Sequence, residues 1–324
     1  MPRADLHSGR HQFILAANMS QPYEKPRNFH APQYWWLFIA KAILWIGSKL
    51  PYRIMLAVGN RLGWLISHFN TKNKRIILRN LSLCFPNLSP LAREQLTTRC
   101  WQSHAIAGFE TAMAWWGSER RLRQLLQVKG EHHLYDALAS KRGIMILTGH
   151  FTTLELAGVM LSLLTPCYST AKHLRNPVAD YLVNQARRQH LKNTLFPENL
   201  KQVHQLLRQG AVISFLLDQD YGTKGSVFAP FFNIPTATTN AIPRIAKMTN
   251  SIVIPTFFYR LPKGQGYQLE FQAPLTYYME NTPLENATFF NQAVEKIAKR
   301  YPEQYGWTYK RFATRPKDEP SLYD

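Results

Sequence analysis

Cysteine is scarce in this chain of 324 residues. The three cysteines, Cys84, Cys100 and Cys167, lie far apart, and no CxxC or mixed cysteine–histidine spacing occurs. A disulfide framework and a zinc site are therefore not expected, and the composition suits a reducing compartment. The three thiols are predicted to be buried structural residues.

Acidic side chains are also few: 20 Asp and Glu stand against 39 Lys and Arg, which gives a formal net charge of +19. Such a charge implies an acidic partner, whether nucleic acid, anionic lipid, a phosphorylated substrate or an acidic carrier protein. Charge alone does not choose among these partners. Apolar residues make up 45% of the chain, which is enough to build a sizeable core.

Residues 1–32 carry no apolar periodicity and are predicted to be disordered, with Met19 as an alternative start. The following segment, 34–50, reads YWWLFIAKAILWIGSKL, and a second apolar stretch covers 54–69. The two stretches are compatible with a transmembrane anchor, an interfacial helix or a buried helix hairpin. Tryptophans at positions 35, 36 and 45 favour membrane contact, because indole rings suit the headgroup boundary.

A basic run, Lys72, Lys74, Arg75 and Arg79, follows the apolar stretches. Next to a membrane, these charges would hold the downstream chain on the cytoplasmic side. No small-residue cleavage site follows a short apolar core, so a removed signal peptide is not expected.

From residue 70 onward, apolar runs of strand length alternate with segments of helical periodicity, which predicts a layered α/β fold. Strands are predicted at 143–148, 212–217, 252–259 and 266–272. Helices are predicted at 76–83, 90–116, 119–127, 154–164, 178–190, 200–209, 241–249 and 288–301. The chain has no internal repeat or low-complexity linker, so its predicted divisions are an extension (1–32), membrane-anchor or interfacial helices (33–69), a catalytic domain (70–316) and a tail (317–324).

The segment 144–155, IMILTGHFTTLE, carries the most chemical information. A buried strand is predicted to end just before His150, and a helix to begin two or three residues after it. Active sites in α/β sheets gather where strands end and helices begin. Glu155, in the first helical turns, is expected to reach back to the imidazole, fix its tautomer and raise the basicity of the other ring nitrogen.

The second nitrogen of such a histidine can take a proton from an alcohol that attacks a thioester. The chain has no GxSxG nucleophile elbow, so direct attack by the acceptor hydroxyl is expected in place of a covalent acyl-enzyme. The structural alternative is a loop histidine beside an acid that the helix dipole favours, because HxxxxE alone is a common chance match.

Two further clusters are candidate binding sites. Asp218 and Asp220 lie in the segment DQDYG after a predicted strand, and could orient an arginine or bind sugar hydroxyls; an ordinary Asp/Gly turn is the alternative. Arg175 precedes the predicted helix 178–190 and Arg187 lies near its end; guanidinium groups suit phosphate, and a solvated basic face is the alternative. An aromatic stretch, 228–239, would line an acyl groove or pack in the core.

Six segments, in this order, resemble the lipid A late acyltransferases, the lauroyl/myristoyl transferase family that acts on Kdo2-lipid IV(A). They are RNLSLCFP (79–86), ETAMAWW (110–116), KRGIMILTGHFTTLELAG (141–158), LRNP (174–177), DQDYG with SVFAPFF (218–222 and 226–232), and PEQYGWTYKRFATRP (302–316). The resemblance covers about residues 35 to 316, and the last segment is especially specific.

The resemblance implies a mixed central sheet sandwiched by helices, with an N-terminal membrane helix docked on the inner membrane and a catalytic domain that faces the cytoplasm. It implies transfer of an acyl chain from acyl-[acyl-carrier-protein] to a Kdo2-lipid IV(A)-like acceptor, without a cofactor, a metal or nucleic acid. The HxxxxD/E pair of the family implies His150 as general base and Glu155 as orienting acid. Arg187 and Asp218 match active-site positions, and Arg175 is a candidate phosphate contact.

Two alternatives remain. A glycerolipid or lysophospholipid acyltransferase shares HxxxxD/E, but that family usually has a Pro-Glu-Gly segment where DQDYG stands here. A basic membrane- or nucleic-acid-binding protein without catalysis would explain the charge but not the ordered motifs. The closing motif favours the lauroyl-type branch, while the acyl chain length and the acceptor chain that is modified stay open.

Overall fold

A computed structural model describes residues 24–196, 199–275 and 282–323. Most of the predicted disordered extension, residues 1–23, lies outside this part. Phe29, which belongs to the same extension, is buried and packs edge-on against Phe38 and Tyr181, with ring centroids 5.1 and 5.4 Å away. The described end of the extension is therefore attached to the domain.

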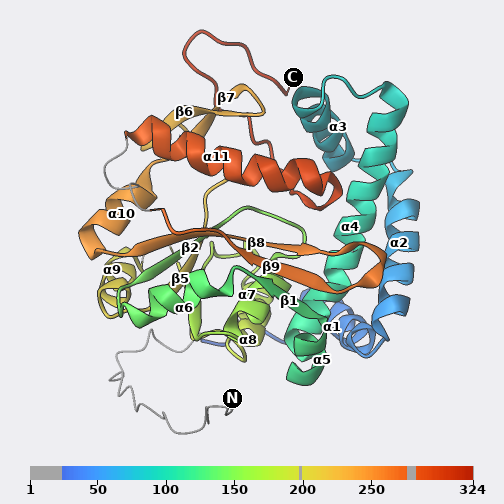
Figure 1. Ribbon diagram of the computed structural model, residues 1–324. Coiled ribbons are helices and arrows are strands. Elements are labelled where there is room, and N and C mark those ends of the chain that lie inside the picture. Colours follow the sequence, from blue (N-terminus) through green and yellow to red (C-terminus); the bar gives the residue numbers. More distant parts are fainter. Residues whose placement is uncertain (1–23, 197–198, 276–281, 324) are drawn as a thin grey trace, which may run out of the picture.

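A mixed seven-stranded sheet forms the centre of the molecule (Figure 1). Its strands follow the order β1 (Leu126–Lys129), β9 (Tyr267–Phe271), β8 (Ile252–Arg260), β2 (Ile144–Thr148), β5 (Val212–Leu216), β3 (Cys167–Thr170) and β4 (Asn193–Leu195). The strands from β8 to β4 are parallel, β9 is antiparallel to β8, and β1 is parallel to β9. The predicted mixed α/β architecture is confirmed, and the carboxyl ends of β2, β5 and β8 meet at the same end of the sheet.

Helices cover both faces of the sheet, and alternate strand residues point to opposite layers. One layer contains α9 (Leu200–Arg208), α10 (Ala241–Thr249) and α11 (Pro283–Arg300). The other layer contains α6 (Glu131–Ala139) and α7 (Leu154–Ser162). A hairpin of β6 (Ser226–Phe231) and β7 (Ile234–Thr239) packs against α11. Figure 1 shows α11 on one side of the sheet and α6 and α7 on the other.

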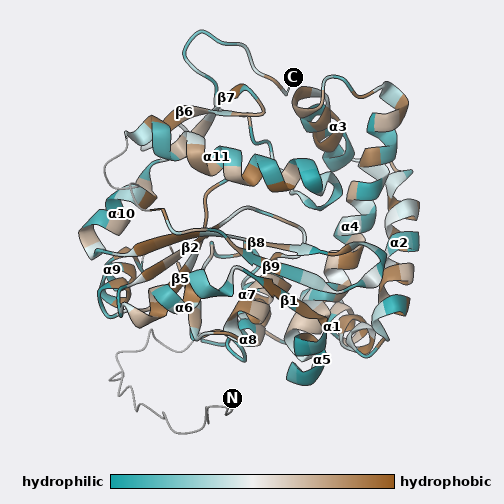
Figure 2. Ribbon diagram, in the orientation of Figure 1, coloured by the Kyte–Doolittle hydropathy of each residue, from teal (hydrophilic) through white to brown (hydrophobic). Residues whose placement is uncertain are grey.

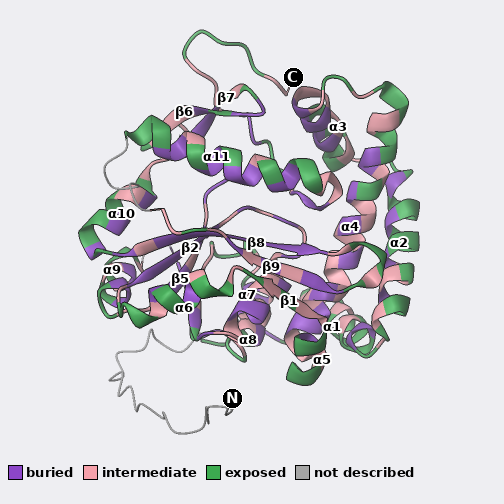
Figure 3. Ribbon diagram, in the orientation of Figure 1, coloured by how far each residue is buried: buried purple, intermediate pink, exposed green. Residues whose placement is uncertain are grey.

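Two apolar clusters hold these layers together. On β2, Met145 and Leu147 face the α11 layer, whereas Ile144 and Ile146 face the α7 layer. All four side chains are buried, and Figure 3 shows the central strands mostly in the buried class. Parallel strands that are covered on both faces require apolar residues at successive positions, which explains why this strand is a continuous apolar run.

Residues 35–116 form four α-helices. They are α1 (Trp35–Ser48), α2 (Tyr52–Ser67), α3 (Lys72–Cys84) and α4 (Pro90–Trp116). Both α1 and α2 pack against α4, and α2 approaches it very closely at Gly59 and Gly63. A Cβ atom at Gly63 would lie 2.3 Å from the Cα atom of Gln102, so this crossing requires glycine.

Among the described residues, no helix combines the length and the apolar character that crossing a membrane requires. The predicted N-terminal membrane helix therefore has no support as a spanning segment. Apolar side chains nevertheless stand on the outer surface of α1, where Trp36, Ile39, Ile43 and Ile46 are each 59–62% exposed. Figure 2 shows the hydrophobic colour on this part of the fold.

Several elements have bounds that differ from the predicted ones, and others were not predicted. The helix expected at 119–127 ends earlier, as α5 (Glu119–Leu125), because the chain enters β1 at Leu126. The short elements β1, α6, β3 and β4 were not predicted. The tail is anchored too: the Tyr323 hydroxyl donates a hydrogen bond to the Asn80 side-chain oxygen at 2.5 Å.

Candidate active site

The register between β2 and β5 brings His150 next to Asp218. Thr148 lies opposite Leu216 at the ends of these parallel strands. His150 lies two residues after Thr148, and Asp218 lies two residues after Leu216. The imidazole Nδ1 lies 2.6 Å from Asp218 Oδ1, and the backbone N–H of His150 donates to Oδ2 at 2.7 Å. Both carboxylate oxygens are thus directed at one residue, which fixes the orientation of the imidazole ring.

Asp218 is almost completely buried, with 2% of its side chain exposed, against 15% for His150. Burial by itself raises the pKa of this carboxyl. The charge and hydrogen bonds of His150, together with the charge of Arg311, lower the pKa by more than burial raises it, so the pKa lies below its ordinary value. An ionised Asp218 accepts the Nδ1–H hydrogen bond and leaves the Nε2 lone pair of His150 directed away from it.

The predicted contact between Glu155 and His150 is not what the structure shows, and Asp218 takes that place. Glu155 stands in the first turn of α7, which begins at Leu154, and its carboxylate faces α8 (Pro177–Arg187). There, Arg187 Nε donates to Glu155 Oε2 at 3.1 Å, and Nη2 bonds to Oε1. The predicted residues thus form two pairs, His150–Asp218 and Arg187–Glu155.

Two residues that were not predicted as site residues surround the imidazole. The side-chain nitrogen of Gln219 lies 3.0 Å from His150 Nε2, so with a proton on Nδ1 the amide donates to the free ring nitrogen. The ring of Tyr309 packs edge-on against the imidazole, with centroids 5.1 Å apart. The sequence signal for Gln219 is its place directly after Asp218, whereas no local pattern places Tyr309 beside a residue 159 positions earlier.

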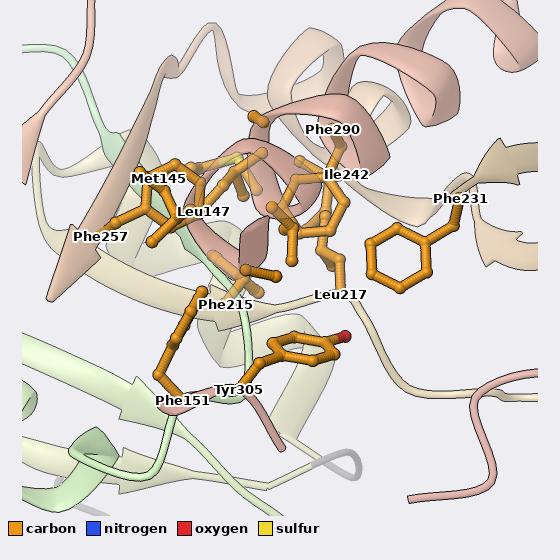
Figure 4. Packing of buried hydrophobic residues seen from close by; sticks show 14 of the residues in the cluster. Met145, Leu147, Phe151, Phe215, Leu217, Phe231, Ile242, Phe257, Phe290 and Tyr305 are labelled. Carbon is orange, nitrogen blue, oxygen red and sulfur yellow. The ribbon is translucent and has the colours of Figure 1, made fainter. Parts of the chain in front are cut away.

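The C-terminal motif 302–316 holds the loop that carries His150 in place. The backbone N–H of Gly306 donates to the His150 carbonyl at 2.8 Å, and Phe151 forms a β-bridge with Tyr305. The rings of Phe151 and Tyr305 are 5.4 Å apart and lie side by side in the core cluster of Figure 4. Asn80, in the first motif, donates to two carbonyls of this segment, at 2.7 and 2.8 Å.

Asp220 and Arg175 have different surroundings. Thr314 donates to Asp220 through its backbone N–H at 2.6 Å and its hydroxyl at 2.8 Å, and Gly222 N–H donates at 2.9 Å. This carboxylate is therefore engaged in holding the C-terminal segment. Arg175 is exposed in the turn before α8, next to the helix N-cap Asn176.

A narrow, mostly apolar pocket lies between α7 and the sheet, next to the Glu155–Arg187 pair. Ile146, Leu161 and Phe258 contribute apolar surface, and Glu155 and Arg187 belong to its lining as well. The predicted aromatic stretch 228–239 lies elsewhere, in the β6–β7 hairpin, and its residues Phe231 and Phe232 are part of the core. Core packing is therefore the role of these two side chains.

The three cysteines are free and buried, as predicted. Within the described ranges, no group of three or more His, Cys, Asp or Glu side chains is arranged to hold a metal ion. The ionisable groups gathered at the sheet end are instead a buried carboxylate, an imidazole and a carboxylate–guanidinium pair. Such a set can accept and return one proton and can bind a polar group beside an apolar chain.

Comparison with known proteins identifies the family. Residues 23–314 match the family described as bacterial lipid A biosynthesis acyltransferase. The chain is 34% identical to the lipid A biosynthesis lauroyltransferase of Escherichia coli K12, over 90% of this chain and 96% of that protein. It is equally 34% identical to the palmitoleoyltransferase of the same organism, over 92% and 97%, and 36% identical to a lipid A biosynthesis acyltransferase of Haemophilus influenzae, over 95% and 99%. The resemblance seen in the sequence is confirmed: this chain belongs to the bacterial lipid A biosynthesis acyltransferase family.

Proposed function

We propose that the chain transfers a fatty acyl group from acyl-[acyl-carrier-protein] to a hydroxyl-acyl chain of a Kdo2-lipid IV(A)-like precursor. The observation that carries this proposal is the His150–Asp218 pair, which lies at the end of the sheet beside the apolar pocket. The family of the chain, and the lauroyltransferase and palmitoleoyltransferase names of two relatives, support the substrate class.

His150 acts as the general base in this mechanism. Its Nε2 takes the proton of the acceptor hydroxyl, while Asp218 stabilises the positive charge that develops on the imidazole. The hydroxyl oxygen bonds to the thioester carbonyl carbon, the carbon–sulfur bond breaks, and the proton passes from His150 to the departing thiolate. The acceptor must first displace the Gln219 amide, which lies 3.0 Å from Nε2.

Glu155 and Arg187 form a charged rim of the acyl pocket in this proposal. Both line the pocket and bind each other, so removing either residue takes a charged contact from the other. A double-mutant cycle tests this role. If the two residues act as one unit, the Glu155→Ala and Arg187→Ala losses in kcat/KM are strongly non-additive; additive losses would contradict a joint role.

The apolar pocket is the proposed site of the transferred acyl chain. Side chains from β2, β5, β8 and α7 line it, so a chain bound there lies between the sheet and the helix layer. Identity does not separate the lauroyl from the palmitoleoyl relative, because both are 34% identical to this chain. The sequence motif favours a lauroyl-type donor, and this preference stays a proposal.

The direct test is a transfer assay with the purified full-length protein. We expect mass spectrometry to show one added acyl group when acyl-[acyl-carrier-protein] and Kdo2-lipid IV(A) are supplied. His150→Ala should lower the rate by about 10²–10⁴-fold while the protein stays folded. Near-normal transfer by the folded variant would refute the mechanism, and transfer to glycerol 3-phosphate or a lysophospholipid instead would refute the acceptor.

A further inference from the structure

A second and larger cleft, of about 610 Å³, lies next to the loop that carries His150. Its walls come from α2, α4, the turn η3 (Pro262–Gly264) between β8 and β9, and the segment that follows α11. Figure 1 shows the β8–β9 turn extending toward α2 and α4. Neither the proposed acyl pocket nor the His150–Asp218 pair contributes to its lining.

The cleft carries an excess of positive charge. Arg53 of α2, Arg99 of α4 and Lys263 of the turn line it, and all three are exposed. In the part of the chain that the structure describes, no ion pair engages these three side chains. Among its described lining residues, Glu303 is the one carboxylate, while Arg260 is neutralised by Glu110 at 2.6 Å.

The cleft also offers uncharged hydrogen-bond donors and an unusual backbone. The side-chain amides of Asn60 and Gln102 belong to its lining. Lys263 has φ of 55°, a left-handed conformation that favours glycine, so this turn holds a lysine at the cleft at some cost in strain. Guanidinium, ammonium and amide donors that converge on one space are the chemistry that binds phosphate.

The floor of the cleft is connected to the loop that carries His150. Ser103, which lines the cleft, lies with its hydroxyl 2.8 Å from that of Thr152, two residues after His150. Gln304, also in the lining, accepts the backbone N–H of Thr152 at 2.8 Å. A group bound in the cleft is therefore held in fixed relation to the loop that carries the base.

We propose that this cleft binds a phosphorylated headgroup of the acceptor lipid, away from the hydroxyl that reacts. The inference rests on the proposed function and assigns a place for the charged end of that substrate. A carrier protein would present its acidic groups on a convex surface. Such a surface fits a concave cleft less well than a small phosphate group does. Helix α2, one wall of the cleft, exposes Leu62 and Leu65 on its outer face, as suits a site at a lipid surface.

The test compares two acceptors, a bisphosphorylated lipid A precursor and the same lipid after removal of its phosphates. The variants are Arg53→Gln with Arg99→Gln, and Lys263→Gln; the control is Arg120→Gln with Lys201→Gln, at exposed positions outside the cleft. We expect the cleft variants to raise KM for the phosphorylated acceptor by roughly tenfold or more, the effect of one lost charge-assisted contact. The kcat, the KM for the donor and the KM for the dephosphorylated acceptor should stay within about twofold of wild type.

Other outcomes would overturn the proposal. Equal losses with both acceptors would show that the cleft does not recognise phosphate, and a raised KM for the donor would assign it to the carrier protein. Equally weakened binding of the variants to phosphatidylglycerol vesicles would assign it to bulk anionic lipid. If the wild type acylates neither acceptor, the proposed function fails. Binding of the radiolabelled phosphorylated precursor in detergent micelles then still tests the cleft. Equal affinity of the wild type and the cleft variants for this precursor would refute the proposed phosphate site.

Discussion

Asp218 directs both of its carboxylate oxygens at His150, so substitutions at this pair test the proposed mechanism most directly. The other carboxylate of the DQDYG motif, Asp220, binds Thr314 and Gly222 instead. Two aspartates that are two positions apart thus have separate tasks. Only the hydrogen-bond partners distinguish the carboxylate that binds His150 from the carboxylate that binds the C-terminal segment.

Asp218→Asn should lower kcat by about 10²–10⁴-fold with little change in KM, because an amide does not stabilise the imidazolium and can hold the wrong tautomer. Rates are measured by mass spectrometry of the acylated lipid. Asp220→Asn is the matched control, and we expect it to reduce thermal stability while kcat stays near that of the wild type. A fully active Asp218→Asn enzyme would exclude the assigned role.

Gly158 is the residue at which the length of the proposed acyl pocket can be tested. It lines the pocket, and a Cβ atom there would meet only Leu191, at 3.8 Å, so the backbone admits a larger side chain. Gly158→Leu should shift the preferred donor to shorter chains, since each methylene excluded from the pocket costs about 0.8 kcal/mol. Gly108→Leu, in open space on α4, is the control in competition assays with mixed donors. An unchanged product spectrum would place the acyl chain elsewhere.

At the scale of elements, buried polar contacts join helices to strands that are distant in the sequence. Glu110 of α4 accepts from Arg260 of β8 at 2.6 and 2.9 Å, and from the Tyr267 hydroxyl of β9 at 2.8 Å. Both charged side chains are buried. The contact explains why a glutamate begins the motif ETAMAWW, in an otherwise apolar stretch. It fixes α4 against the sheet, and α4 in turn carries Ser103, which contacts Thr152 in the loop that carries His150.

Glu110→Ala should lower the free energy of unfolding by about 3–5 kcal/mol, because it leaves the Arg260 charge buried without its partner. Tyr267→Phe removes one hydrogen bond but keeps the ion pair, and should cost only about 0.5–1.5 kcal/mol. Urea unfolding at neutral pH measures both values. Similar losses for the two variants would show that the ion pair is not the main contribution.

At the scale of the whole molecule, the apolar outer surface of α1 faces away from the core, and we predict that it makes the membrane contact expected of this segment. The residues Trp36, Ile39, Ile43 and Ile46 follow helical spacing and form one stripe. Together with the net charge of +19, such a stripe favours attachment to an anionic bilayer surface.

Replacing Ile39 and Ile43 together by aspartate should reduce co-sedimentation with anionic phospholipid vesicles by at least tenfold. Each isoleucine side chain that becomes buried in the bilayer contributes about 1.5–3 kcal/mol to binding. Leu91→Asp is the control, because Leu91 is 69% exposed but lies at the start of α4. Unchanged sedimentation of the double variant would rule out this surface as the docking site.

The buried thiols and phenols of the protein allow a prediction of how its free energy of unfolding depends on pH. Burial raises the pKa of all three thiols, for Cys167 to about 12, and also those of the Tyr267 and Tyr305 phenols. Unfolded thiols ionise near pH 9, so above that pH the unfolded state releases protons that the folded state retains. This contribution to stability is complete below pH 9 and decreases as the pH rises toward 12.

Urea midpoints should therefore fall between pH 9 and 11, while they change little between pH 7 and 8.5. In the same experiments, the native thiols should resist alkylation by iodoacetamide at pH 8, because a buried thiol with a raised pKa supplies little thiolate. Cys167→Ala should reduce the alkaline loss, although it also removes packing atoms. A midpoint that does not change up to pH 11 would contradict the prediction.

Much of this architecture could be predicted from sequence. The helix Pro90–Trp116 and the helix Ala241–Thr249 match their predicted bounds, because Ser89 caps the first and a left-handed Asn250 ends the second. The apolar runs of β2, β5 and β8 are visible because these strands are covered on both faces. The short edge strands β1 and β4 were missed, since three or four residues carry too little periodicity to be distinguished from a loop.

The sequence by itself determined the α/β class, the family and the position of His150 at a strand end, because apolar periodicity and ordered motifs are properties of neighbouring residues. Tertiary structure alone decided which carboxylate binds the imidazole. Glu155, five residues away, faces Arg187 on α8, whereas Asp218, 68 residues away, reaches His150 because β5 is the parallel neighbour of β2. Strand order and register are long-range choices that depend on how the layers pack, and the spacing HxxxxE does not contain them.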